Sequence, residues 1–145
     1  MSQATLPDTS TSAATLRAVT IHFPGGLLGF PEIHDYVLLD GPSEGLFWLV
    51  GDGEQAPRFL LNDPFVFFEG YSLELSPEQT GLIEVEESST VAVLAITIPS
   101  SDAPWTANLQ GPVVINVEKA IGAQIVLPGS QPGVRQPFQP KLTAA

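Results

Sequence analysis

The sequence predicts an all-β domain, mainly antiparallel, in the form of a small barrel or a sandwich-like domain with one short helix. Nearly every apolar segment is short and alternates with polar residues, as half-buried strands do. Proline is about twice as frequent as in an average protein, with 14 in 145 residues, which favours short elements and many loops. Roughly eight such segments follow one another at a spacing of about 8–12 residues, which is typical of compact β folds.

The first half of the chain carries four predicted strands. Val19, Ile21 and Phe23 alternate with polar residues and indicate a half-buried strand. Short apolar runs follow at 36–39 and 46–50, separated by a turn of Asp, Gly, Pro and Ser. A fourth run at 59–61 ends at Asp63, which the following proline holds in an extended or turn conformation.

One short helix is expected after a strand in which Tyr71, Leu73 and Leu75 share a face. Ser76-Pro77-Glu78-Gln79 has a serine cap, proline at the first helical position and glutamine three residues after the cap. Gly81 follows closely, so the helix is expected to have one or two turns.

The segment 90–98 is apolar on both faces, which places it in the middle of the fold. Val93, Leu94 and Ile96 are therefore expected to be buried, together with Val113 and Ile115 of the next strand. A hairpin connection at 119–122 leads into a last strand at 123–127.

The domain organisation follows from where this patterning begins and ends. Residues 1–14 have no apolar periodicity and are expected to form a disordered leader. Residues 15–138 form a single domain, of the size at which one chain commonly makes one core. Residues 139–145 are expected to be a flexible tail.

The charge balance indicates which partners suit the chain. Sixteen acidic and five basic residues give a formal net charge of −11. Direct binding to nucleic acid is excluded, since it needs clustered Lys and Arg to neutralise phosphates, and so is docking on an anionic membrane. The charge suits a basic protein partner, and it equally keeps the domain in solution. With no secretory signal and no spanning segment, we expect a cytoplasmic protein, monomeric when free.

Catalytic chemistry is not indicated. The chain has no cysteine and only two histidines, so we predict no metal site and no cofactor. His34 beside Asp35 is either an oriented imidazole or, as we favour, an ordinary loop histidine. Asp63, Glu69 and Glu74 flank an aromatic cluster, but they fit solvated strand-end carboxylates better than a hydrolytic pair. No catalytic residue is assigned.

Two stretches stand out instead. In Phe23-Pro24-Gly25-Gly26-Leu27-Leu28-Gly29-Phe30 the glycines permit tight backbone bends. The stretch is either an ordinary strand connection or a partner-binding loop that presents Phe30 or Leu27. In Thr106-Ala107-Asn108-Leu109-Gln110-Gly111-Pro112-Val113-Val114-Ile115-Asn116, the Asn108 amide can bond its own backbone. Asn116 bonds either across strands or to a partner, and Trp105 is either a core plug or an exposed anchor.

The candidate partner-binding residues come mostly from these stretches. They are Phe23, Gly26, Leu27, Gly29, Phe30, Asp63, Trp105, Thr106, Asn108, Gln110, Asn116 and Arg135.

Five pieces, in order between about residues 19 and 138, resemble the signature of the FliW family of flagellar assembly factors. They are the 23–30 stretch, Asp63-Pro64-Phe65, the block from Leu94-Ala95-Ile96 to Asn116, Gly122-Ala123-Gln124-Ile125-Val126-Leu127, and Val134-Arg135. The resemblance implies a small non-enzymatic protein that binds flagellin and the RNA-binding regulator CsrA. Flagellin in the cytoplasm would hold the protein. Once flagellin is exported, the freed protein would stop CsrA from repressing flagellin synthesis.

Two other classes stay open on the residues alone. The first is an export chaperone that only escorts flagellin. The second is an unrelated β-fold hydrolase or glycan-binding module.

Overall fold

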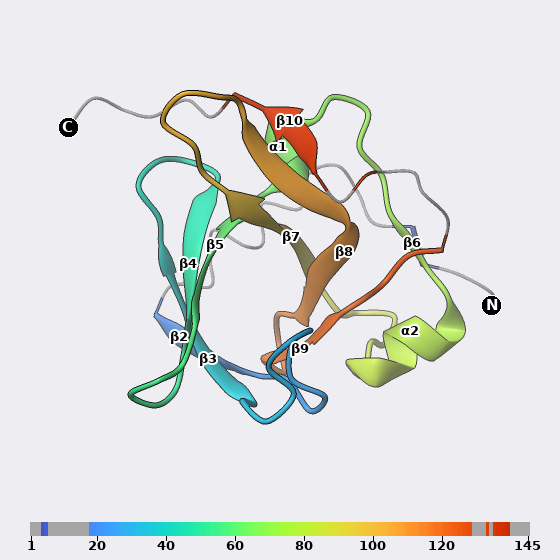
Figure 1. Ribbon diagram of the computed structural model, residues 1–145. Coiled ribbons are helices and arrows are strands. Elements are labelled where there is room, and N and C mark those ends of the chain that lie inside the picture. Colours follow the sequence, from blue (N-terminus) through green and yellow to red (C-terminus); the bar gives the residue numbers. More distant parts are fainter. Residues whose placement is uncertain (1–3, 6–17, 129–132, 134, 140–145) are drawn as a thin grey trace.

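A computed structural model describes residues 4–5, 18–128, 133 and 135–139. These residues form a mostly β domain built around a closed barrel, with short helices on its outside (Figure 1). The barrel strands are β2 (Val19–His22), β3 (Asp35–Asp40), β4 (Leu46–Gly51), β5 (Arg58–Asn62), β7 (Val91–Ile98), β8 (Trp105–Asn116) and β9 (Ile121–Gln124). Three further strands lie outside the barrel: β1 (Ala4–Thr5), β6 (Glu74–Leu75) and β10 (Gln136–Phe138). The predicted all-β class is confirmed.

The seven barrel strands pair in the order β8-β7-β5-β4-β3-β2-β9, and β9 pairs back with β8 to close the ring. All of these pairings are antiparallel except β2 with β9, which is parallel and is made at His22 and Ile121. β10 adds to the outer edge of β8. Closure leaves no open edge along the paired parts of the seven strands, whereas the first residues of β8 extend beyond β9 and pair with β10.

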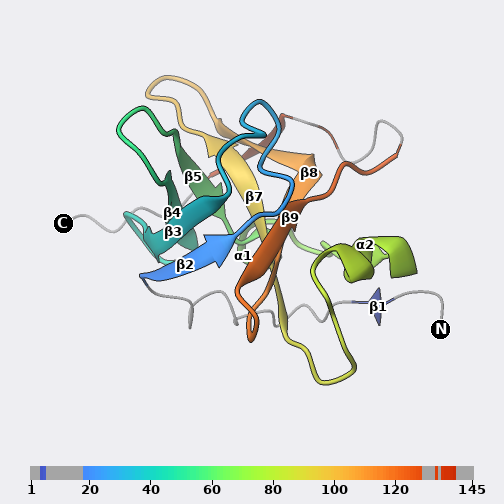
Figure 2. The same ribbon diagram turned by 90° about the horizontal axis from the view of Figure 1, so that it is seen from below.

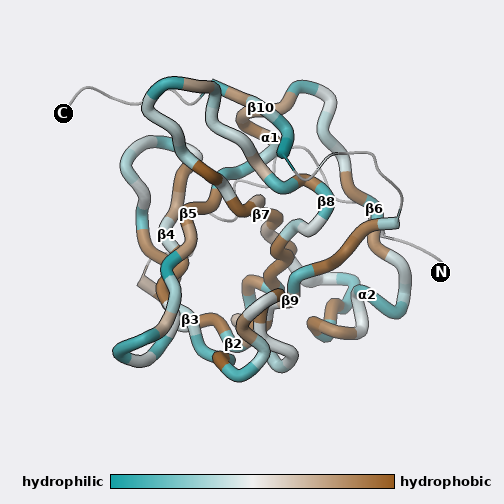
Figure 3. The backbone as a smooth tube through the Cα atoms, viewed as in Figure 1, coloured by the Kyte–Doolittle hydropathy of each residue, from teal (hydrophilic) through white to brown (hydrophobic). Residues whose placement is uncertain are grey.

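The core explains why 90–98 is apolar on both faces. Ala92 and Leu94 of β7 point into the barrel, where they pack among side chains of all the neighbouring strands. Val91 and Val93 point outward and are covered by Leu73, Leu75 and neighbouring residues. In Figure 3 the hydrophobic colour lies along the strands, whereas the long connecting loops are mostly hydrophilic. Of the five residues expected to be buried, four are fully buried and Ile96 is half-buried.

The described residues include two short helices, where the sequence predicted one. The predicted helix is α2 (Pro77–Leu82), and both hydrogen bonds of its capping box form between Ser76 and Gln79. The second is α1 (Pro64–Phe67), capped by Asp63, whose backbone is extended as expected (φ −87°, ψ 106°). The sequence contains a local pattern for this helix, because an Asp cap followed by proline at the first helical position is a common helix start.

The structure also differs from the sequence prediction at smaller elements. The apolar segment around Leu73 is buried on one face as expected, but only Glu74 and Leu75 are in a strand. The last barrel strand is Ile121–Gln124, somewhat earlier than predicted. Within the segment expected to be a disordered leader, Ala4 and Thr5 pair with β6; the other residues of that segment, and 140–145 of the expected tail, lie outside the described residues.

Candidate functional site

The second signature stretch forms β8, and its middle is a large bulge. Leu94 of β7 pairs with Val113, whereas Ile96, two residues later, pairs with Asn108. Four residues of β8, 109–112, therefore lie opposite a single residue of β7. A bulge of this kind removes backbone groups from the ladder, and these groups need other partners. We call residues 109–112 the β8 bulge.

These groups find partners within the stretch and in the segment that follows it. Asn108 Oδ1 accepts hydrogen bonds from the backbone N–H groups of Gln110 and Gly111, both at 3.0 Å. Pro112 has no N–H to satisfy, and its carbonyl accepts from Ile125 N at 2.9 Å. The Gly111 carbonyl accepts from Gln124 Nε2 at 3.0 Å. The backbone groups of the bulge are therefore bonded by Asn108 within the stretch and by Gln124 and Ile125 after it, and Asn108 has the backbone-bonding role expected of it.

The first signature stretch connects β2 to β3 as a tight loop, residues 24–30, which we call the glycine loop. Gly26 and Gly29 both have positive φ, at 68° and 86°. At Gly26 a Cβ would lie 2.6 Å from the Phe30 carbonyl oxygen, so only glycine fits there, whereas the space at Gly29 is open. Leu27 and Phe30 form an isolated bridge, with Phe30 N donating to Leu27 O at 2.8 Å. The loop is thus held in one conformation by its own backbone.

Gln124 on β9 joins the two signature stretches. Its Oε1 accepts from the backbone N–H of Leu28 at 3.0 Å, and its Nε2 donates to the Gly111 carbonyl in the β8 bulge. Figure 2 shows the loop after β2 beside β9, consistent with this contact. This contact holds the glycine loop to the β8 bulge. We use the name loop–bulge surface for Leu28 and Phe30 of the loop, Gln124, and Val126 two residues after it.

The exposed side chains of the loop–bulge surface are apolar. Leu28 is 62% exposed, Val126 59% and Phe30 38%, and the Phe30 ring packs edge-on against Phe59 at 5.8 Å between centroids. Leu27 is only 2% exposed and Phe23 is fully buried. Leu28, and not Leu27, is therefore the leucine that the loop presents. Of the two residues that the loop was expected to present, Phe30 is exposed and Leu27 is buried.

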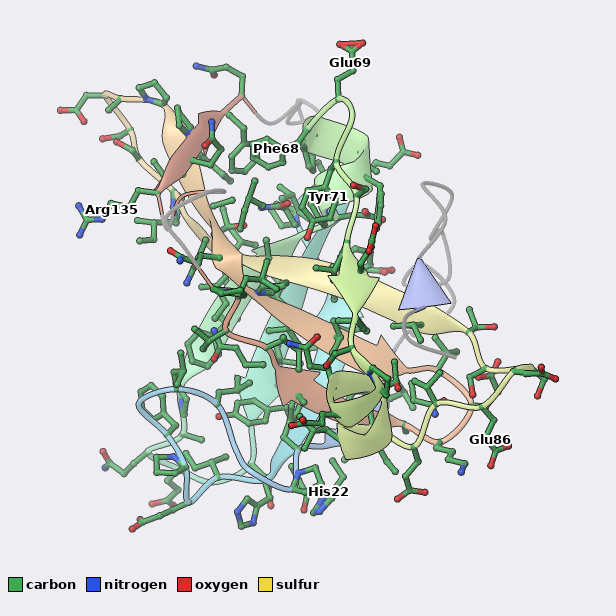
Figure 4. The ribbon with its side chains drawn as sticks, turned by 90° about the vertical axis from the view of Figure 1, so that its right-hand side faces the viewer. His22, Phe68, Glu69, Tyr71, Glu86 and Arg135 are labelled. Carbon is green, nitrogen blue, oxygen red and sulfur yellow. The ribbon has the colours of Figure 1, made fainter. Side chains whose placement is uncertain are left out.

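A second group of candidates lies at the start of β8, before the bulge, and on β10 beside it. Trp105 and Thr106 are half-buried at the start of β8, where β10 pairs with them. The indole N–H of Trp105 donates to the Ser100 carbonyl at 2.9 Å, and its ring lies 6.4 Å from Phe138. Trp105 is therefore packed against its neighbours. Arg135 is exposed and points away from the domain in Figure 4. Gln110, in the bulge, donates through its side chain to the Leu127 carbonyl at 3.4 Å.

Asp63 lies at the N-terminus of α1. Its side chain caps α1 by accepting from Phe65 N at 3.0 Å, and the residue is only 6% exposed. Burial raises the pKa of Asp63 to about 6, and the backbone N–H groups of Phe65 and Val66 counteract this in part. Burial, together with the negative charge of Asp63, raises the pKa of Tyr71 to about 12. Asp63 holds the helix in place and faces protein rather than solvent.

Asn116, the last residue of β8, is fully buried. Its amide donates to the carbonyl of Ile83 at 2.9 Å and to that of Glu84 at 3.2 Å, and its Oδ1 accepts from Lys119 N at 3.3 Å. It ties the end of α2 to the β8–β9 turn. The sequence alternatives were a bond across strands or to a partner; the observed bonds instead reach the end of α2 within the fold.

The described ionisable groups form a few pairs on a chain with a formal net charge of −11. Lys119 pairs with both Glu84 and Glu86, at 3.3 and 3.4 Å. The guanidinium of Arg58 lies over the Trp48 ring at 5.1 Å. His22 contacts Asp35 at 2.9 Å, and His34 Nε2 is 3.1 Å from the Pro31 carbonyl. Among the described residues, no three His, Asp or Glu side chains are grouped so as to hold a metal ion.

The candidates thus fall in three places: the glycine loop with the β8 bulge, the β8–β10 edge near Asp63, and the buried Asn116. Sequence reasoning missed Gln124, Leu28, Val126 and Phe138. No spacing rule marks Gln124, because its partners lie far away in the chain. Phe138 was placed at the end of the domain without a role.

Comparison with known proteins places these features in a family. A sequence model described as "FliW protein" matches residues 8–138. The chain is 38% identical over 121 residues to a flagellar assembly factor FliW of Natranaerobius thermophilus, covering 81% of this chain and 80% of that one. It is 36% identical over 126 residues to a flagellar assembly factor FliW of Treponema denticola, covering 86% of each chain.

The fold is also similar to a solved structure. The crystal structure of a flagellar assembly factor FliW superposes with a TM-score of 0.75 at 29% sequence identity. The alignment covers 83% of this chain and 86% of that one.

Proposed function

The chain belongs to the FliW family of flagellar assembly factors, and from this premise we propose that it binds flagellin and CsrA one at a time. Bound flagellin keeps the protein away from CsrA. Once flagellin has been exported, the freed protein binds CsrA and relieves the repression of flagellin synthesis. The observation that carries the proposal is the match over residues 8–138, which includes both signature stretches that Gln124 joins.

Charge supports CsrA as one partner. The chain carries a formal net charge of −11, and CsrA is a basic RNA-binding protein. Among the described cations, Lys119 is held between two glutamates, so its charge is locally neutralised. An acidic surface steers a basic partner into encounter and competes poorly for nucleic acid itself. The proposal therefore includes no direct contact with RNA or DNA.

The loop–bulge surface supports flagellin as the other partner. Its exposed side chains Leu28, Phe30 and Val126 are apolar. The glycine loop is fixed by its own bridge and by Gln124. A surface that is already ordered loses little conformational entropy on binding. We therefore place an apolar, weakly salt-dependent contact with flagellin on this surface.

The remaining parts of the proposal follow from the same premise. The protein acts in the cytoplasm without catalysis, metal or cofactor, and it is a monomer when free. Among the described residues, no helix is both long and apolar enough to cross a membrane.

The proposal is tested by titrating purified CsrA into the protein with and without flagellin. We expect binding to each partner alone and loss of CsrA binding when flagellin is present. The CsrA association rate should fall as salt rises to physiological strength, where the screening length is about 8 Å, while flagellin association changes less. A ternary complex would contradict the switch. Binding of flagellin without CsrA would assign the protein as an export chaperone, and binding of neither would remove the flagellar proposal.

A further inference from the structure

The outer edge of β8 is occupied by the chain's own C-terminal segment. β10 pairs antiparallel with the first residues of β8, with Gln136 opposite Ala107, Pro137 opposite Thr106, and Phe138 opposite Trp105. One further backbone bond, from Leu109 N to the Gly133 carbonyl at 3.1 Å, extends the contact toward the β8 bulge. The β8–β7 pairing on the other side belongs to the barrel itself. β10 is therefore an addition to a barrel that is closed without it.

A single side chain anchors this segment. Phe138 is 7% exposed and lies among the rings of Phe67, Phe68 and Trp105, with centroid distances of 5.2, 5.4 and 6.4 Å. The pocket floor consists of Ala95, Ala107 and Leu109. Figure 4 shows Phe68 beside β10, with Arg135 directed away from the pocket. Arg135, Pro137 and Gln139 are exposed and Gln136 is half-buried.

This is the way in which a bound peptide adds to a sheet edge: backbone pairing gives affinity and one pocket gives specificity. The aromatic rings around Phe138 come from α1, the residue after it, and β8. The groove therefore belongs to the domain, and β10 contributes only the side chain that fills it. A three-residue strand with one anchor is at the low end of local stability within a folded protein. The segment can therefore detach without opening the barrel.

We propose that the β8 edge and its aromatic pocket form a docking groove for an extended segment of flagellin that carries one aromatic side chain, and that β10 occupies this groove until flagellin displaces it. The inference rests on the proposed function for the identity of the partner. The groove itself is defined by β10, which already occupies it. Its lining is apolar, which suits the partner whose association depends less on salt. It also adjoins the β8 bulge, because Leu109 belongs to both.

A reversible lock on β10 tests the inference in the full chain. The sequence has no cysteine, so Thr106→Cys with Pro137→Cys introduces a pair that can form only one disulfide within the chain. The two positions are Cα partners in the register, and Pro137 is exposed, so the link lies away from the Phe138 pocket. The oxidised form retains β10, and dithiothreitol releases it.

The first arm uses a fluorescent peptide with the sequence of residues 133–139 as the probe. A full-length Phe138→Ala variant has an empty pocket, and we expect it to bind this peptide at least tenfold more tightly than the wild type does. The oxidised double-cysteine form should bind it at least tenfold more weakly than the reduced form. A peptide with alanine in place of its phenylalanine should not bind. Equal binding by the locked and reduced forms, or no binding by Phe138→Ala that retains the wild-type far-UV spectrum, would overturn the groove.

The second arm uses flagellin. We expect the oxidised double-cysteine protein to bind flagellin at least tenfold more weakly than the same protein after reduction, and Phe138→Ala to bind it more tightly than the wild type. Equal flagellin affinity of the oxidised and reduced forms would overturn flagellin as the occupant. If wild-type protein does not bind flagellin at all, the proposed function fails, whereas the peptide arm still decides whether the groove exchanges its occupant.

Discussion

The side-chain oxygen of Gln124 accepts a hydrogen bond from the backbone N–H of Leu28 at 3.0 Å, although 96 positions separate the two residues. The same side chain donates to the Gly111 carbonyl. One amide thus fixes the glycine loop against the β8 bulge and holds together the two stretches that mark the family in the sequence.

Gln124→Ala should loosen this contact. It removes two hydrogen bonds, each of which contributes about 1 kcal/mol, so we expect a loss of about 1–2 kcal/mol in unfolding free energy. Hydrogen exchange at the Leu28 amide should accelerate, and flagellin affinity should fall. Gln124→Glu keeps the acceptor for Leu28 and loses the donor to Gly111, so the Leu28 amide should stay protected. Gln55→Ala, exposed in the β4–β5 turn, is the matched control. Unchanged Leu28 exchange in Gln124→Ala would show that the contact is not formed in solution.

Gly26→Ala and Gly29→Ala form a matched pair within the glycine loop. Both positions have positive φ, which costs a residue with a Cβ about 1–2 kcal/mol. At Gly26 the new Cβ would also meet the Phe30 carbonyl oxygen at 2.6 Å and Pro31 Cα at 2.7 Å, whereas Gly29 has open space. Urea unfolding should therefore show a clearly larger loss for Gly26→Ala. Equal losses would mean that the loop relaxes around the added methyl group.

Asn116→Ala tests whether this residue serves the fold. The substitution leaves the buried carbonyl of Ile83 and the partly buried carbonyl of Glu84 without their side-chain donor, and we expect a loss of about 2–4 kcal/mol in unfolding free energy. The melting temperature should drop, while partner affinity per folded molecule stays the same. A variant that melts like the wild type but no longer binds a partner would instead assign Asn116 to an interface.

The raised pKa of Asp63 predicts a pH effect with a definite sign. The folded state holds the Asp63 proton up to about pH 6, whereas the ordinary value is 3.8. The stabilisation by this proton is complete below about pH 4 and is lost as pH rises to about 6. Asp63→Asn keeps an acceptor for the α1 cap and removes the charge.

Urea unfolding of both proteins between pH 4 and pH 7 measures this difference. At about 1.4 kcal/mol per pKa unit, reduced for solvent screening, Asp63→Asn should gain about 1–2 kcal/mol relative to wild type over that range. Because the wild type and Asp63→Asn have all other carboxyl groups in common, only Asp63 contributes to the pH-dependent difference in their unfolding free energies. Parallel stability curves for the two proteins would contradict a raised pKa.

Local patterns in the sequence predicted much of the fold. The two-faced apolar segment 90–98 required a central strand, because both its faces had to be covered. The Ser76–Gln79 capping box required a helix start. Asp63 followed by Pro64 is an equally local pattern for the start of α1, although we predicted only a turn or extended backbone there. These features depend on neighbours within a few residues, where backbone geometry alone sets the requirement.

The sequence by itself determined the β class, the acidic surface and the two signature stretches, because periodicity, charge and turn chemistry act over a few residues or over the whole composition. Only the tertiary structure decided that Leu28 rather than Leu27 is exposed, that Asn116 bonds inside the fold, and that Phe138 fills a pocket between α1 and β8. These facts depend on which distant segments meet when the barrel closes. A contact such as that between Gln124 and Leu28 is set by the register of several strands together, and no single stretch of the chain contains it.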